Sequence, residues 1–92
     1  MEGMCRNIRP LFNFEPPATR EEVEAAALQY VRKVAGAPRP SQANERAYAV
    51  AVAAVAEATQ QLLDALVTTA PPKDREVEAA KARARAAKRY AS

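Results

Sequence analysis

Apolar residues recur at helical spacing in three segments that prolines separate. In the first, Thr19 and Glu22 have the T-x-x-E spacing of a capping box, and Gly36 stands where a helix commonly ends. Between them, apolar side chains recur every three or four residues, at Val23, Ala26, Ala27, Tyr30, Val31 and Val34. This pattern predicts a helix over residues 20–35.

The second segment has a heptad pattern. Ser41 follows Pro40 and is a candidate N-cap for the helix that begins there. The seam then repeats at spacings of four and three, at Tyr48, Val52, Val55, Thr59, Leu62 and Leu66. We expect a helix over about residues 42–68, before the turn TTAPPKD.

The third segment has a narrow apolar stripe, formed by Val77, Ala80, Ala84, Ala87 and Ala91. Acidic residues come early in it and basic residues late, as the helix dipole favours. The pattern predicts a helix over about residues 73–90. The alternation of Tyr48, Val50 and Val52 in the second segment would also suit a strand, but the alanines around it favour helix, so no strand is predicted.

Residues 1–18 precede these helices and do not read as a helix. Pro10, Pro16 and Pro17 favour extended or turn geometry. Large apolar residues are dense there, at Ile8, Leu11, Phe12 and Phe14. We therefore predict a single all-α domain over residues 1–92, a three-helix bundle-like fold on which an extended, proline-containing N-terminal arm packs.

The core of this domain should be thin. Hydrophobic residues make up 49% of the chain, but 23 of them are alanine, which buries little area. A stretch without charge, Ala47–Ala56, also has no good reason to face water. We predict a protein partner or a homo-oligomer, with a candidate interface on this stretch at Tyr48, Val50, Val52 and Val55.

Several strings together identify a family resemblance. MCRNIRPLFNFEPPAT, LQYVRKVAG, PSQAN and APPKDREVEAAKARARAA resemble a family of short bacterial proteins of unknown function, over Met4 to about Arg89. The resemblance implies a bacterial origin and a self-contained unit, but no activity and no functional residues. Residues 1–3 precede the usual start of the family, so translation could start at Met1 or Met4.

The residue types present leave little room for catalysis. The chain has no histidine, the usual general base and commonest metal ligand, and it has one cysteine and two glycines. Its acidic clusters lie in first helical turns, where the helix dipole favours them. We predict no catalytic residue, no cofactor and no metal, and hence no enzyme.

Cys5 is the one candidate reactive thiol. Arg6 and Arg9 lie close in sequence and favour a thiolate. If translation starts at Met4, removal of that methionine would leave Cys5 with its own amine as a base. The alternative is that Cys5 is a small buried hydrophobe.

Positive charge is concentrated at the C-terminal end. Seven basic and three acidic residues follow Pro72, whereas residues 1–72 have seven basic and eight acidic residues. On a helix, an arc of about 100° would contain Lys81, Arg85, Lys88 and Arg89. This candidate polyanion-binding stripe suits nucleic acid. It also suits an acidic protein, or a solvated face on which Glu78 pairs with Lys81 or Arg85.

No apolar run reaches the roughly 18 residues of a membrane span, and no secretory signal is visible. We therefore expect a cytoplasmic protein without membrane contact. The leading hypothesis is a non-enzymatic helical interaction module that binds a protein or itself. A nucleic-acid or ribonucleoprotein accessory protein and a thiol or redox role of Cys5 are the alternatives.

Overall fold

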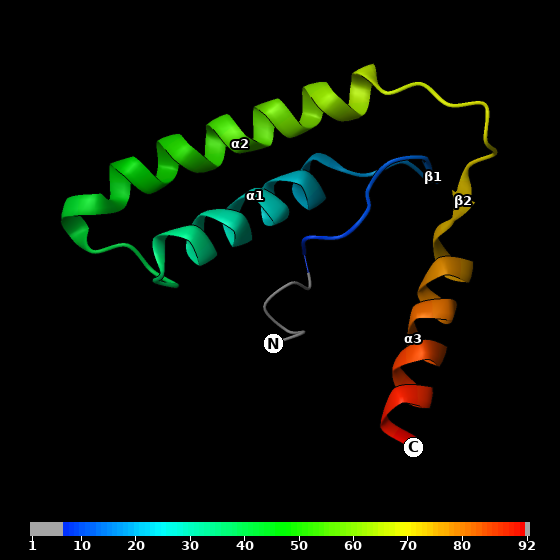
Figure 1. Cartoon of the computed structure of the whole chain (residues 1–92). Coiled ribbons are helices and arrows are strands. Elements are labelled where there is room, and N and C mark those ends of the chain that lie inside the picture. The colour runs from blue at the N-terminus through cyan, green and yellow to red at the C-terminus, as the bar shows by residue number, and fades with distance from the viewer. Residues whose placement is uncertain (1–6, 92) are drawn as a thin grey trace.

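The computed structural model describes residues 7–91, and the side chains of residues 7–89. Three helices make up most of it: α1 (Arg20–Ala35), α2 (Glu45–Ala65) and α3 (Arg75–Ala91). The short elements are β1 (Phe14–Glu15), a 3-10 turn η2 (Gln42–Asn44) and β2 (Lys73–Asp74) (Figure 1). The predicted all-α, three-helix class is confirmed.

Helix α1 begins and ends through the local signals that its sequence contains. The Glu22 amide donates to Thr19 Oγ1 at 3.1 Å, and Glu22 Oε1 accepts from the Thr19 amide at 2.9 Å. These two bonds satisfy backbone donors that a helix start leaves free. At the other end Gly36 adopts a left-handed conformation with φ 79°, and its amide donates to the Arg32 carbonyl.

Helix α2 is shorter than predicted at both ends. The Ser41 side chain makes no capping bond, and a 3-10 turn precedes the helix, which starts at Glu45. Leu66 is extended, with φ −66° and ψ 139°, so the helix ends at Ala65 rather than near residue 68. The proline pair after Ala70 disfavours helical geometry there, and Thr68 Oγ1 accepts from the Ala70 amide in a local turn instead.

Helices α1 and α2 lie side by side and share a small core (Figure 1). The buried apolar residues are Val23, Ala27, Val31 and Ala56. Leu11, Val52, Val55 and Leu63 pack around this cluster and stay partly exposed. The Cα trace measures 43 × 38 × 15 Å.

A strand pair that the sequence did not predict joins the arm to the start of α3. Strands β1 and β2 are parallel, with Phe14 opposite Lys73 and Glu15 opposite Asp74. Asn13 extends the contact: its carbonyl accepts from the Lys73 amide at 2.8 Å, and its Nδ2 donates to the Pro71 carbonyl at 3.1 Å. Asn13 has φ 65°, a conformation that asparagine tolerates better than most residues. The Glu15–Pro16 peptide is cis.

The described part of the N-terminal arm packs on the helices, as predicted. Leu11 contacts the core cluster, and Phe12 and Phe14 are half-buried. The Asn7 amide donates to Gln29 Oε1 of α1 at 2.8 Å. Ile8 is the exception among the large apolar residues, because its side chain is exposed.

Helix α3 departs from a bundle, because it leads away from the α1–α2 pair (Figure 1). Its residue Val77, which the sequence places on the apolar stripe, is exposed. The rest of that stripe is alanine, whose burial against another helix gains little free energy. The helix starts at Arg75 rather than Lys73, because Lys73 and Asp74 form β2 and Asp74 Oδ1 caps the Val77 amide at 3.0 Å.

We expect the arm to contribute measurably to stability. Leu11→Ala should lower the free energy of unfolding by about 2 kcal/mol, the low end for a leucine in a core, because Leu11 is only half-buried. Val67→Ala is the control, since Val67 is 92% exposed and should change stability by less than about 0.5 kcal/mol. Urea unfolding followed by circular dichroism measures both, and equal midpoints would show that the arm is not docked.

Candidate functional site

An open apolar groove runs between the arm, α1 and α2. Its volume is about 630 Å³. The arm contributes residues 8–13, and the loop between α2 and β2 closes one end through Thr68 and Ala70. The helical lining residues are Ala26, Ala27, Tyr30, Val55, Thr59, Leu62 and Leu63. The sequence pattern did not predict this groove.

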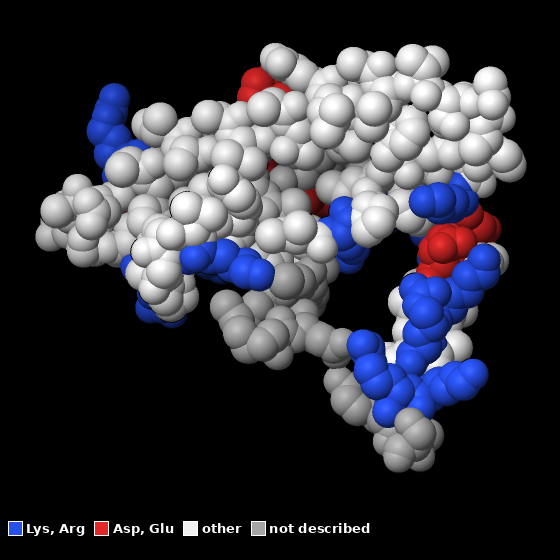
Figure 2. Space-filling model, viewed as in Figure 1, with Lys and Arg blue, Asp and Glu red and all other residues white. Residues whose placement is uncertain are grey.

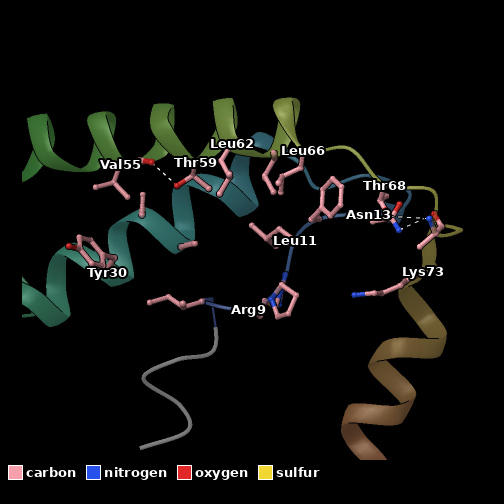
Figure 3. A pocket seen from close by; sticks show the side chains of 17 residues that line it. Arg9, Leu11, Asn13, Tyr30, Val55, Thr59, Leu62, Leu66, Thr68 and Lys73 are labelled. Atoms are coloured by element: carbon pink, nitrogen blue, oxygen red, sulfur yellow. Dashed lines mark hydrogen bonds between the residues drawn. The ribbon is translucent and has the colours of Figure 1, made fainter.

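Large apolar side chains form the groove walls and remain open to solvent. Figure 3 shows Thr59 and Leu62 on α2, and Leu66 just after it, above Leu11 of the arm, with Tyr30 on α1. Leu62 is 56% exposed and Tyr30 is 50% exposed. Leucine side chains in this position can gain free energy only by contact with another apolar surface.

The two charged residues of the groove lining, Arg9 and Lys73, both have partners within the molecule. Arg9 forms an ion pair with Glu22 at 2.8 Å. The Lys73 ammonium lies 5.3 Å from the centre of the Phe14 ring, within cation–π range. Since the other residues of the groove lining are uncharged, the groove suits a mainly apolar ligand surface.

Beside the groove, the carboxylate of Glu22 joins three parts of the chain. Its Oε1 and Oε2 accept from Arg75 at 2.5 and 3.0 Å, a bidentate pair that holds the start of α3. Oε2 also accepts from Arg9 of the arm, and Oε1 accepts from the Thr19 amide. Among residues 7–91, Glu22 thus both completes the capping box of α1 with Thr19 and links α1, the arm and α3.

These contacts favour the charged forms of both partners. Hydrogen bonds from Arg75 and from the Thr19 amide lower the pKa of Glu22 from 4.5 to about 2, against a smaller opposing effect of burial. The bond to Glu22 raises the pKa of Arg75. Arg75 also donates from Nε to the Pro16 carbonyl at 2.6 Å, and its guanidinium lies 6.0 Å from the centre of the Phe14 ring.

The predicted polyanion stripe lies on α3, where Lys and Arg gather (Figure 2). Its members are not equivalent. Lys81 pairs with Glu78 at 3.3 Å, and Lys88 and Arg89 also make contacts. Arg85 forms no ion pair with another described residue and lines a second cavity, of about 680 Å³, between the arm and α3. The stripe therefore does not present four free cations.

The four predicted interface residues do not form one exposed surface. Val50 is 58% exposed, but Val52 and Val55 pack against the core cluster. The Tyr48 hydroxyl donates to the Ala37 carbonyl at 3.0 Å. Val55 is the one that also lines the groove.

Two further sequence predictions concern a thiol and a metal. Cys5 lies outside the described residues, as does Arg6. Within residues 7–91, no group of three or more acidic, cysteine or histidine side chains lies close enough to hold a metal ion. No helix in the same range is long and apolar enough to cross a membrane.

The fold and the groove define a small, mostly helical protein with an apolar surface site. The chain belongs to the family described as an uncharacterized conserved protein (DUF2277), whose model matches residues 4–81. The match includes Glu22, Arg75 and all the groove residues, and it ends before Arg85, Lys88 and Arg89. No curated protein and no solved structure matches the chain.

We expect the Glu22 contacts to make stability depend on pH. Because the folded pKa of about 2 lies below 4.5, this stabilisation is complete above pH 4.5 and is lost as pH falls toward 2. The shift corresponds to at most about 3 kcal/mol. Glu22→Gln should lose that amount at pH 7, and its stability should approach that of the wild type near pH 2, as measured by urea unfolding at each pH.

Glu24→Gln is the matched control on the same helix. Its pair with Arg20 is an exposed one at 3.3 Å, so the loss should stay under about 1 kcal/mol. Stability curves of wild type and Glu22→Gln that remain parallel from pH 7 to pH 2 would contradict the assigned role of Glu22.

Proposed function

We propose that the protein is a non-enzymatic interaction module that binds a protein surface through the apolar groove. The observation that carries this proposal is the exposure of Leu62 and Tyr30 at the groove walls. The chain has 21 apolar residues larger than alanine or cysteine, and of those whose side chains the structure describes, just Val23 and Val31 are buried in the core. Large apolar residues are therefore placed at the groove although the core lacks them.

The surroundings of the groove support the same function. Exposed apolar surfaces rimmed by polar residues commonly mark protein–protein contact sites. Large side chains that pack into a pocket contribute most of the binding energy of many interfaces, and the groove provides both such side chains and a pocket. The bidentate Glu22–Arg75 pair and the β1–β2 contact fix the arm that forms one wall, so the groove exists before a partner binds.

Photo-crosslinking in the cells that naturally make the protein tests this proposal. A photoreactive amino acid in place of Leu62 should give a covalent adduct to a protein, because its side chain would lie within the interface. The same amino acid in place of Val67 is the control, since Val67 is 92% exposed and does not line the groove. The Leu62 probe should give at least tenfold more adduct.

Absence of a protein adduct from position 62, or equal adducts from both positions, would overturn the proposal. The mass of the adduct and its peptides identify the protein that is bound. An adduct to a membrane lipid or to nucleic acid alone would also contradict it.

A second candidate function is nucleic-acid binding by α3, favoured by the gathering of Lys and Arg on this projecting helix (Figure 2). Phosphate contacts depend on charge and do not need a pocket. The pairing of Lys81 with Glu78 weakens the candidate, because part of the charge is already neutralised.

Filter binding to duplex DNA at several salt concentrations decides on this second function. If α3 binds phosphates, affinity should fall with salt with a log–log slope of about −0.9 per phosphate contact. Arg85→Ala should reduce that slope by about one unit, and Arg39→Ala, in the loop after α1, should leave it unchanged. No binding at low salt would eliminate this candidate.

A further inference from the structure

The chain exposes much more surface than a compact protein of its size. Its accessible surface is 7147 Å² at 10.0 kDa. A compact monomer of that mass exposes about 5,200 Å², so the excess is about 1,900 Å². The radius of gyration agrees, at 15.6 Å where about 12 Å is usual for 92 residues.

Two features contribute to this excess, because α3 leads away from the other helices and the α1–α2 pair has an uncovered apolar groove. Stable domains bury their apolar faces between two packed layers of secondary structure. Here α1 and α2 lie side by side and α3 leads away from them, so α1 and α2 shield each other only along their shared edge (Figure 1). The groove with Tyr30 and Leu62 lies open on a face that a second layer would cover.

The excess surface is large enough for an interface with a second copy of the chain. A standard interface removes about 800 Å² from each partner, well within the excess of about 1,900 Å². A second copy packed over the groove would add a second helical layer to the α1–α2 pair. Two layers are what the architecture of a stable domain requires.

Charge also favours a second copy over a charged partner. In a two-fold symmetric contact the same surface patch faces itself, so charges near the axis would meet their own kind. Arg9 and Lys73, the charged groove residues, are held by Glu22 and by the Phe14 ring. The surface over α2 in Figure 2 is largely uncharged. Because Lys73 keeps its positive charge beside the Phe14 ring, a two-fold axis would lie over the uncharged α2 wall of the groove, where Leu62 is exposed.

We infer that the groove is the interface of a two-fold symmetric homodimer, in which Leu62 and Tyr30 of each copy pack into the groove of the other. This inference rests on the proposed function and names the partner. This interface differs from the one that the sequence predicts on residues 47–56, because Val50 of that stretch does not line the groove.

Sedimentation equilibrium of the full chain across a concentration series tests the inference. The wild type should sediment at 20 kDa, twice 10.0 kDa, at micromolar concentration. Leu62→Glu and Tyr30→Glu should each raise the dimer Kd at least tenfold, because two like charges would be buried together. Both residues are at least half exposed, so the folded monomer should tolerate the change, and circular dichroism verifies this.

Matched controls lie on the same helices or just beyond them. Val34→Glu on α1, at 69% exposure, and Val67→Glu after α2 should leave the Kd within about twofold, since neither residue lines the groove. A monomer at about 100 μM, or equal weakening by the control variants, would overturn the inference.

The crosslinking experiment separates this inference from the proposed function. An adduct of the Leu62 probe to another protein, with a monomeric wild type, leaves the interaction module intact and overturns the homodimer. No adduct and no dimer overturns both. An adduct between two copies of the chain, lost with Tyr30→Glu, supports both.

Discussion

The contact of Glu22 with two arginines is the interaction on which the arrangement of the chain depends. Helix α3 buries little apolar surface, so its direction is set by β2 and by the bidentate bond from Arg75 to Glu22. The same carboxylate holds Arg9 of the arm and caps α1. A charge-assisted bond with several donors is strong and directional, whereas contact between alanines is neither.

A high alanine content makes this polar fixation necessary. Alanine favours helix formation but contributes little buried area, and the buried apolar residues among those described are two valines and two alanines. The arm compensates in part, because Leu11 packs on the cluster where α1 and α2 meet. Polar contacts at Asn13, Glu22 and Arg75 then fix segments that apolar packing alone would leave loosely placed.

The sequence predicted the local features well and the distant contacts poorly. Thr19, Glu22 and Gly36 define α1 because a cap needs only neighbours three or four residues away. The bond between Glu22 and Arg75 joins residues 53 positions apart, and no periodic pattern records such a pair. Strands of two residues leave no alternation to detect. The groove was missed for the same reason, because its walls come from the arm, α1 and α2 together.

The position at which α2 ends determines how one end of the groove is formed. A helix that continued to residue 68 would have followed the heptad and directed the chain away from the arm. Because Leu66 is extended, the chain turns there toward β2, and Leu66 and Thr68 become the end wall of the groove beside Leu62. A monomer would be more soluble with polar residues at Tyr30, Leu62 and Leu66, since none of the three is buried. Apolar residues at these positions therefore make physical sense if another surface covers them.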